Sequence, residues 1–311
     1  MSPEPVLQAI DLSKRFNSRW AVHELNLAVP RGEVFGFLGP NGAGKSTTIR
    51  MMLSLITPTC GRVELFGKPL LRHRAKLLAR VGGLVERADF YLYLTARRNL
   101  EIVAALTGKA DTKDIDAVLD TVGLLNRAED KVKTYSHGMK QRLGIAQALL
   151  GHPEFIILDE PTTGLDPIGI KEVRDLIRRM SAEHAITIFL SSHLLSEIEQ
   201  TATSMAIINA GKLVVQGKVK ELLEEQEGFV RIDARPQDEV LRIINEHRLA
   251  TAATRTGEII EARMPSSNVP VLARLLVEGG VEVRALIPRR SLEEYFLSLT
   301  EQAEIPRRGP A

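Results

Sequence analysis

The sequence predicts an α/β fold, in which a three-layer α/β domain is followed by a smaller α+β domain. Continuous apolar runs, which suit strands buried on both faces, recur at residues 34–38, 155–158, 186–190 and 205–208. The segments between them carry apolar residues three and four positions apart, as at 49–56 and 173–180, which indicates helices. This alternation is typical of a sheet covered by helices on both faces.

The strand pattern is interrupted between about residues 89 and 151. Within this stretch Ile115, Val118, Leu119 and Val122 again show helical spacing. We therefore expect a helical subdomain at about 89–151, inserted into an α/β domain that spans residues 1–225.

A second domain is expected at residues 226–311. A helix around residue 244 and an apolar helical stripe over 292–299 accompany its strand-like runs. Those runs cover 230–234, 258–264 and 281–287. The pattern favours a small α+β domain. We interpret this domain as one that enlarges the contact between two copies of the chain in a dimer. Regulation and a purely stabilising role are the alternatives.

Composition argues against several classes of protein. The chain has 311 residues, a net charge of +2 and a single cysteine, so neither a disulfide framework nor a thiolate metal site is expected. We find no signal-peptide pattern and no run near the roughly 20 apolar residues that cross a bilayer. We expect a cytosolic protein that reaches a membrane through a partner. Interspersed charges argue against nucleic-acid binding, and the basic cluster at 72–80 is interpreted as a solvated helix face rather than a binding patch.

The segment GPNGAGKST lies between a predicted strand and a predicted helix, where a loop can bind a nucleoside triphosphate. Its glycines let backbone N–H groups wrap the phosphates, and the helix N-terminus adds partial positive charge. Lys45 is expected to reach the terminal phosphates, and the Ser46 hydroxyl to ligate Mg²⁺. The flanking strand and helix disfavour the alternative of a simple glycine-rich turn. The predicted phosphate-binding residues are Gly39, Pro40, Asn41, Gly42, Ala43, Gly44, Lys45, Ser46 and Thr47.

Two carboxylates follow the buried run at 155–158 and form the second part of the predicted site. Asp159 and Glu160 fall where open α/β sheets place their ligands. Asp159 is predicted to hold Mg²⁺ through water, and Glu160 to orient and deprotonate the attacking water. A pair of ordinary solvated acids is the alternative. We disfavour it because a phosphate loop without an acidic partner would leave its metal under-coordinated.

The segment YSHGMKQRLGIAQALL predicts a helix with Ser136 as its N-cap. This helix start offers another anion site. Because one chain already satisfies its phosphates with the loop at 39–47, the second site has a use if it reaches the γ-phosphate held by another copy. A nucleotide-sandwiched dimer is one reading of this segment, and a simple capped helix is the other.

Taken together, five segments resemble the ATP-binding subunits of ABC transporters in order and spacing. They are GPNGAGKST, YSHGMKQR, FIILDEP, GLDP from Gly164 and SSH from Ser191. The resemblance implies that Ser136 and Gly138 contact the γ-phosphate of the opposite subunit's ATP, and that Asp166 ties the two sites together. It also implies that His193 contacts the γ-phosphate and the catalytic water, while Phe16 stacks on adenine. Without the family, His193 would be read as a helix-start residue and Phe16 as a core aromatic.

Three positions depart from the family's usual pattern. His137 and Met139 stand where glycine and glutamine are usual, and Glu86 takes the place of a glutamine that normally touches Mg²⁺ and the attacking water. A carboxylate at that place repels the triphosphate unless the metal or a proton compensates. With LTARRNL from Leu94 and the ending SLEEYFLSLT, these features resemble the branch that serves antibiotic, peptide and lipid-type exporters. Glu86 lies where the family's coupling loop meets the membrane subunit, so we expect it to help transmit the nucleotide state.

The resemblance implies a homodimeric engine at the inner face of the cell membrane. ATP binding would close two copies, hydrolysis would reopen them, and an integral-membrane permease would convert the motion into export. One alternative is a mechanical ABC ATPase acting on ribosomes or DNA, but the second cassette, coiled coil or zinc motifs of those branches are not visible. Another is a small-molecule kinase or GTPase, which leaves the segment around Ser136 and His193 unexplained. The transported molecule is expected to be set by the permease.

Overall fold

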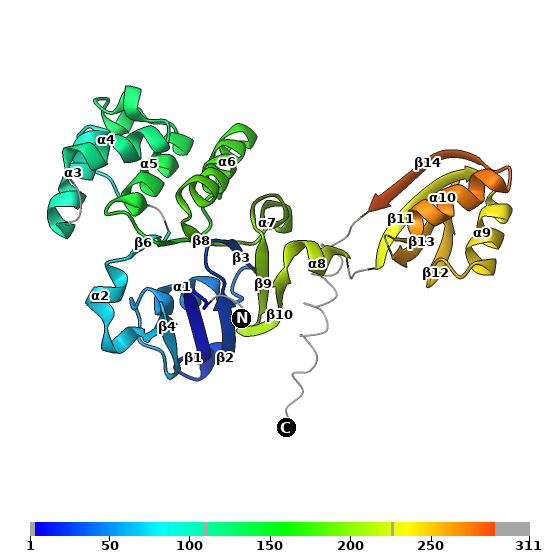
Figure 1. The fold of residues 1–311 in the computed structure, drawn as a ribbon, viewed down its shortest axis with the longest axis horizontal. Coiled ribbons are helices and arrows are strands. Elements are labelled where there is room, and N and C mark those ends of the chain that lie inside the picture. The colour runs from blue at the N-terminus through cyan, green and yellow to red at the C-terminus, as the bar shows by residue number, and fades with distance from the viewer. Residues whose placement is uncertain (1–3, 87, 109–110, 225–226, 266, 290–311) are drawn as a thin grey trace. The chain divides into compact units, whose positions relative to one another are not determined.

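The computed structural model describes residues 4–86, 88–108, 111–224, 227–265 and 267–289. Contacts divide the chain into two compact units, with the boundary between Gly217 and Lys218. A functional division near residue 225 stays a prediction. The two units are described one at a time below (Figure 1).

The first unit contains a six-stranded sheet whose central strands run parallel. Its order is β10-β9-β3-β8-β7-β6, and β8 therefore lies between β3 and β7. Strands β3, β7, β8 and β9 are buried along their whole length, as expected for strands covered on both faces. All four predicted apolar runs are thus confirmed as strands. The bounds are β3 (Val34–Leu38), β6 (Val81–Leu84), β7 (Phe155–Leu158), β8 (Thr187–Ser192), β9 (Ser204–Asn209) and β10 (Lys212–Lys218).

A second, antiparallel sheet was not predicted from the sequence. It has the order β2-β1-β4-β5, with bounds β1 (Leu7–Phe16), β2 (Arg19–Val29), β4 (Cys60–Leu65) and β5 (Lys68–Pro69). The pairing of β1 with β2 shifts register after Ala9 and again after Leu12. Asp11 and Glu24 adopt positive φ angles in these strands. These irregularities break the two-residue alternation by which a half-buried strand is recognised.

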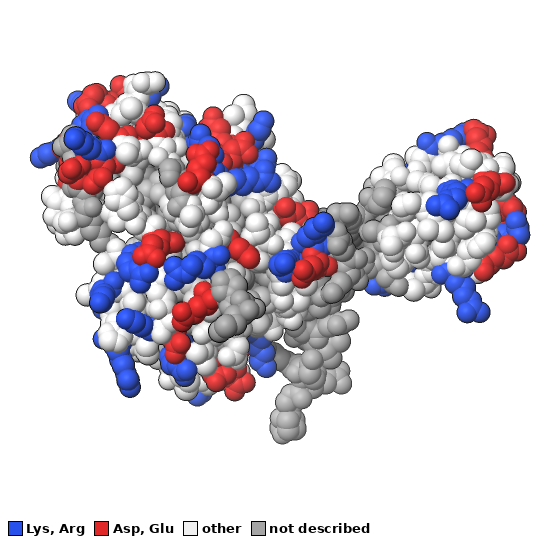
Figure 2. Space-filling view, viewed as in Figure 1, with Lys and Arg blue, Asp and Glu red and all other residues white. Residues whose placement is uncertain are grey.

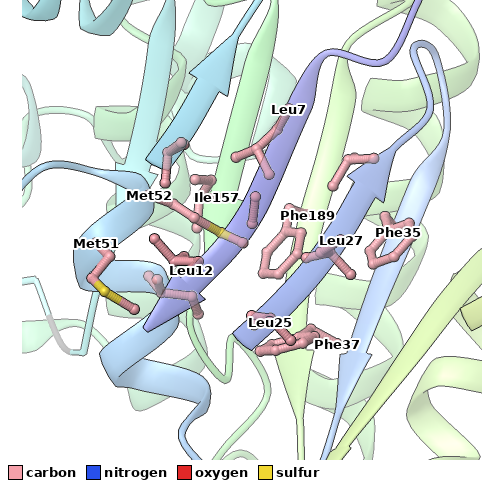
Figure 3. Close-up of a cluster of buried hydrophobic side chains, with 14 of the residues drawn as sticks. Leu7, Leu12, Leu25, Leu27, Phe35, Phe37, Met51, Met52, Ile157 and Phe189 are labelled. Atoms are coloured by element: carbon pink, nitrogen blue, oxygen red, sulfur yellow. The ribbon is translucent and has the colours of Figure 1, made fainter. Parts of the chain in front are cut away.

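The core of this unit joins the two sheets and the first helix. Leu7, Leu12, Leu25 and Leu27 of the antiparallel sheet lie close to Phe35, Phe37 and Phe189 of the parallel sheet, and Met51 and Met52 of α1 join the same cluster (Figure 3). The rings of Phe35 and Phe189 stack with centroids 5.7 Å apart. This packing fixes the carboxyl end of β3, from which the phosphate loop departs.

Helices pack around the parallel sheet of the first unit. Helices α3, α4 and α5, which lie between β6 and β7 in the sequence, contact one another (Figure 1). That residues 89–151 form a subdomain of their own stays a prediction. In α6, the predicted face of Val173, Leu176, Ile177 and Met180 is buried. The α-helices among the described residues of this unit are α1 (Lys45–Met52), α2 (Arg74–Leu78), α3 (Ala96–Thr107), α4 (Thr112–Thr121), α5 (His137–Leu149), α6 (Pro167–His184) and α7 (Leu195–Thr201). Short 3₁₀ helices cover Leu70–Arg72, Leu125–Arg127 and Val132–Thr134.

One of the predicted helices is shorter than expected, and the basic cluster is exposed as expected. The helix expected to run through Ile56 ends at Met52, although Leu53 and Ile56 still pack against the core. The basic cluster at 72–80 covers the end of one 3₁₀ helix and the short α2, with Arg72, Arg74 and Lys76 exposed, as expected for a solvated face. Acidic and basic side chains are interspersed on the visible surface of both units (Figure 2).

Within the described residues, the second unit begins with helix α8 (Val219–Glu224), which precedes a small α+β domain of two helices and four strands in the order βαββαβ. Its antiparallel sheet has the order β12-β13-β11-β14, and apolar side chains of α9 and α10 form a core with β11 and β13. Strand β12, which is short and mostly exposed, and helix α10 were not predicted. The helix expected over 292–299 lies outside the described residues. The bounds are β11 (Glu227–Arg235), α9 (Gln237–Glu246), β12 (Ala252–Thr256), β13 (Ile259–Pro265), α10 (Asn268–Glu278) and β14 (Glu282–Arg289).

None of the helices within the described residues is both long enough and apolar enough to traverse a bilayer.

Candidate nucleotide-binding site

The predicted phosphate loop, the carboxylate pair and His193 meet at the carboxyl ends of three neighbouring strands. The loop at 39–44 follows β3, the pair Asp159 and Glu160 follows β7, and His193 follows β8. Because β3, β8 and β7 are adjacent and parallel, their ends lie at one edge of the sheet. Segments far apart in the sequence therefore form one cleft.

The phosphate loop requires glycine at particular positions. Gly42 and Gly44 have φ angles of 81° and 109°, which side chains rarely tolerate. A Cβ atom at Gly39 would lie 2.5 Å from the carbonyl oxygen of Ile208, and one at Gly44 would lie 2.6 Å from that of Ala21. The loop is thus held between β9 and β2, with Asn41 and Gly42 exposed at its tip.

Helix α1 begins directly after this loop and leaves its N-terminal N–H groups available. Gly44 is the N-cap and supplies no side-chain acceptor, and Ser46 and Thr47 of the first turn are half-buried. Uncapped N–H groups at a helix start form an anion site. The loop and α1 together provide the geometry that a triphosphate needs.

Lys45 is almost fully buried in the cleft, with 5% of its side chain exposed. Its Nζ atom donates to the carbonyl oxygens of Gly39 at 2.7 Å and Pro40 at 3.3 Å. The same Nζ atom lies 3.3 Å from Oε1 of Glu160. The ammonium group is thus held among acceptors that an incoming phosphate can replace.

The carboxylate of Glu160 contacts three other side chains of the site, those of Lys45, Thr163 and His193. Its backbone has a φ of 49°, and its Oε2 atom accepts a hydrogen bond from Thr163 Oγ1 at 2.8 Å and lies 3.2 Å from His193 Nδ1. Burial raises the pKa of the Glu160 carboxyl, but the hydrogen bond from Thr163 and the neighbouring Lys45 and His193 oppose it and leave the pKa below its ordinary value. Glu160 is therefore ionised at neutral pH and able to accept a proton.

Asp159 is buried beside Glu160 and is held by a serine of β8. Ser191 Oγ, which is fully buried, donates to Asp159 Oδ1 at 2.6 Å and accepts from the backbone N–H of Glu160 at 2.9 Å. This hydroxyl joins the two consecutive carboxylates to the strand that carries His193. Ser191 belongs to the SSH segment, but no role for it was predicted from the sequence.

A pocket of about 280 Å³ opens beside these groups. Ser46, Asp159 and Glu160 contribute hydroxyl and carboxylate oxygens to it, which are the ligand types that Mg²⁺ prefers. Within the described residues, no three His, Cys, Asp or Glu side chains cluster as a metal cage. Few protein ligands suit Mg²⁺, because it keeps waters and binds substrate phosphates. The lining residues are Ser46, Glu86, His137, Gln141, Asp159, Glu160 and Thr163.

Ser136 caps helix α5, as predicted. Its hydroxyl accepts a hydrogen bond from the backbone N–H of Met139 at 3.2 Å, and its side chain is exposed. Asp166 caps α6 in the same way and accepts from Gly169 N–H at 2.8 Å. An added Cβ atom at Gly138 would lie 3.9 Å from Gly169, so the starts of α5 and α6 are neighbours. Both caps are exposed to solvent.

Of the two remaining predicted residues, Glu86 borders the pocket and Phe16 is not among the residues that line it. Glu86 lines the pocket, adopts a φ of 62° and forms an ion pair with Arg50 of α1, a partner that no sequence motif indicated. Phe16, at the end of β1, is half exposed and lies under Lys14, whose Nζ atom is 5.2 Å from the ring centroid. The reading of Phe16 as a core aromatic is therefore wrong.

Comparison with known proteins identifies the family to which this site belongs. The family profile described as "ABC transporter" matches residues 22–163. Over 296 residues the chain is 42% identical to the bacitracin transport ATP-binding protein BcrA of Bacillus licheniformis. The aligned region covers 94% of this chain and 97% of that protein. The chain belongs to the ABC transporter ATP-binding proteins.

This ABC ATP-binding subunit has relatives in other transport systems. It is 38% identical over 222 residues to the lantibiotic transport ATP-binding protein SrtF of Streptococcus pyogenes, a match that covers 71% of this chain and 95% of that protein. Among solved structures it is similar to cbiO1 from Clostridium perfringens, described as part of the ABC transporter complex cbiONQ. That similarity has a TM-score of 0.66 at 26% identity and covers 78% of this chain and 95% of cbiO1.

Membership confirms the resemblance drawn from the five sequence segments, including its peptide-antibiotic branch. The ABC ATP-binding cassette binds ATP and hydrolyses it to power transport, so this chain is an ATPase subunit of a transporter. The alternatives of a kinase, a GTPase and a ribosome- or DNA-directed ATPase are set aside.

Proposed function

We propose that two copies of this ABC subunit close around Mg·ATP and drive a membrane permease that exports a peptide antibiotic. The observation that carries this proposal is that Lys45 and His193 both meet the carboxylate of Glu160 at the edge of the sheet, with nitrogen-to-oxygen distances of 3.3 Å and 3.2 Å. A cation for the phosphates and a carboxylate base for water are thus adjacent.

Binding of ATP is proposed to rearrange the contacts of Lys45. Its Nζ atom leaves Glu160 Oε1 for the β- and γ-phosphates, and the Glu160 carboxylate becomes available to the attacking water. His193, 3.2 Å from Oε2 of Glu160, is positioned to contact the γ-phosphate and the same water. In this scheme, the binding of ATP therefore also frees the Glu160 carboxylate from Lys45.

Magnesium is proposed to be held by the Ser46 hydroxyl and, through water, by the Asp159 carboxylate. When bound, the ion neutralises charge that develops on the phosphate oxygens. Ser191 keeps Asp159 oriented toward the pocket through its hydrogen bond of 2.6 Å. Waters and phosphate oxygens would supply the remaining ligands, because Mg²⁺ usually keeps several waters and binds few protein carboxylates.

The dimer is proposed from the exposed starts of helices α5 and α6. Ser136 and Gly138 are accessible at the N-terminus of α5, where a second phosphate-bearing copy can dock, and Asp166 lies next to them. Since this chain carries both the phosphate loop and the capping helix, an identical copy completes both sites. The sandwich, the residue roles and the adenine contact of Phe16 are parts of this proposal.

Glu86 is proposed to report the nucleotide state to the permease. It lines the pocket and is paired with Arg50, which belongs to the same helix as Lys45 and Ser46. The pairing supplies a positive charge that offsets the repulsion between a carboxylate and the triphosphate. A change at the phosphates can thus reach Glu86 through α1.

The cargo and the cellular location are proposed from the relatives. Bacitracin and lantibiotics, which the names of BcrA and SrtF state as transported, are both peptide antibiotics, so a cargo of that class is the proposal here. The chain would work at the cytoplasmic face of the cell membrane, bound to a permease and without a nucleic-acid partner.

The test uses Glu160→Gln, which removes the base and preserves size. We expect ATP binding to persist, turnover to fall by about 100-fold or more, and a dimer to form with Mg·ATP in size-exclusion chromatography with light scattering.

The dimer contact is tested in the Glu160→Gln background. There, Ser136→Asp keeps an N-cap but adds negative charge toward the phosphate, and should abolish the dimer without abolishing ATP binding. Ser136→Asn is the neutral control. Near-normal hydrolysis by Glu160→Gln, or a monomer at saturating Mg·ATP alone and with the permease, would refute the proposal.

A further inference from the structure

Helix α7 carries a carboxylate that joins the loops of two catalytic candidates. Oε1 of Glu197 accepts a hydrogen bond from Thr162 Oγ1 at 2.7 Å, and Oε2 accepts one from Ser192 Oγ at 2.6 Å. Thr162 and Ser192 are buried, with 7% and 1% exposure. Each oxygen of one side chain thus serves a different segment of the chain.

The two segments are the ones that carry Glu160 and His193. Thr162 follows Glu160 by two residues, and the next residue, Thr163, donates to the Glu160 carboxylate at 2.8 Å. Ser192 immediately precedes His193, and its hydroxyl accepts from the backbone N–H of Leu194 at 2.9 Å. The bonds to Glu197 therefore flank both side chains that meet at 3.2 Å.

The Glu197 brace is separate from the buried Ser191 link. Ser191 ties β8 to the end of β7 at Asp159 and at the Glu160 backbone. That link fixes the start of the loop, while Glu197 holds the loop beyond Glu160 and the turn at His193. Hydrogen bonds to an ionised acceptor are shorter and stronger than neutral ones, which suits a rigid connection.

We propose that Glu197 is a positioning residue for ATP hydrolysis, which holds the Glu160 loop and the His193 turn in register through Thr162 and Ser192. This inference rests on the roles proposed above for Glu160 and His193. Glu197 itself touches neither ATP nor the attacking water in this scheme. Its loss therefore changes the rate of the chemical step and leaves the affinity for ATP in place.

The experiment compares matched variants of the full chain by ATP affinity, measured as equilibrium binding of a fluorescent nucleotide, and by kcat. Thr162→Val removes one hydroxyl at nearly constant volume, and Thr162→Ser keeps it. We expect kcat to fall about 10-fold in Thr162→Val and in Glu197→Ala, with ATP affinity within about twofold of the parent. Thr162→Ser should retain the parent rate. Ser196→Ala, an exposed change on the same helix, is the control for α7.

A double variant tests whether both changes act through one contact. If Thr162 acts through Glu197, adding Thr162→Val to Glu197→Ala lowers kcat by less than the product of the two single effects. Multiplicative losses would show that Thr162 and Glu197 act independently, and weakened ATP binding would show that Glu197 supports the site as a whole; either result overturns the inference. Normal kcat in Thr162→Val and Glu197→Ala, with Glu160→Gln inactive, also overturns it while leaving the proposed function intact. An active Glu160→Gln variant instead refutes the proposed function.

Discussion

The hydroxyl of Ser191 offers the most direct test of how this cleft is held together. We consider Ser191→Ala, which removes a single oxygen from a fully buried position. That oxygen donates to Asp159 Oδ1 at 2.6 Å and accepts from the backbone N–H of Glu160 at 2.9 Å. The substitution therefore breaks two hydrogen bonds and leaves a carboxylate oxygen and an N–H group without these partners.

The expected loss of stability follows from these two bonds. A hydrogen bond to a charged acceptor contributes about 1.5–3 kcal/mol, and a buried donor left unsatisfied costs about 1–3 kcal/mol. Because the two terms overlap and the pocket admits some water, we expect the free energy of unfolding of the first unit to fall by about 3 kcal/mol. Alanine adds no atoms, so no overpacking enters this value.

Urea unfolding followed by fluorescence measures this loss in the unit concerned. Trp20 is the only tryptophan in the chain and belongs to β2 of the first unit, so its signal reports that unit. With a slope of about 3 kcal/mol per molar, the urea midpoint should fall by about 1 M. The measurement is made without nucleotide, since ligand binding stabilises the folded state by mass action.

Ser196→Ala provides the matched control for this prediction. Ser196 is exposed on α7, and its replacement should change the free energy of unfolding by no more than about 0.5 kcal/mol. If Ser191→Ala shifted the midpoint no more than Ser196→Ala, the claim that this hydroxyl stabilises the two carboxylates would be wrong.

Three further predictions concern the phosphate site and the opposite edge of the sheet. Arg50→Ala should weaken ATP binding by less than about 10-fold, because it leaves Glu86 without its partner, and adding Glu86→Gln should restore the affinity, as nucleotide titration can test. Gly44→Ala should abolish ATP binding in the same titration, since the φ of 109° and a carbonyl oxygen 2.6 Å from the new Cβ exclude a side chain. Hydrogen bonds from Arg80 hold the pKa of Glu154 below its ordinary value, so its stabilising effect is present above about pH 4.3 and is lost as pH falls through the lower folded-state pKa. Glu154→Gln should therefore reduce the acid sensitivity of stability, and only slightly, because the pair is partly exposed.

The buried strands were predictable because their signal is local. The runs at 34–38 and 155–158 coincide with β3 and β7, and helix α5 begins after Ser136 as its capping residue predicts. A strand covered on both faces must be apolar throughout, and a helix start must satisfy its own N–H groups nearby. Both requirements are visible within a few residues of sequence.

The antiparallel sheet escaped prediction because its pattern is interrupted. Positive φ angles at Asp11 and Glu24 and the register shifts between β1 and β2 disturb the alternation of exposed and buried side chains. The accessory helix α10 was likewise missed. Its residues are strongly apolar, but the face that it buries is recognised only from its contacts with the small sheet.

The sequence by itself determined which chemical groups are available to the proposed ATP site. Glycines that permit close backbone approach, Lys45, the pair Asp159 and Glu160, and His193 are fixed by residue type and by spacing along the chain. Those properties are local, so they survive without knowledge of the fold.

Only the tertiary structure decided which of these groups meet and what holds them. The order of strands places β8 between β3 and β7, so that Ser191 reaches Asp159 across 32 positions of sequence and His193 lies beside Glu160. It also pairs Arg50 with Glu86 and gives Glu197 its two hydroxyl partners. Strand order and register depend on packing between distant segments, and no periodicity within a single segment contains that information.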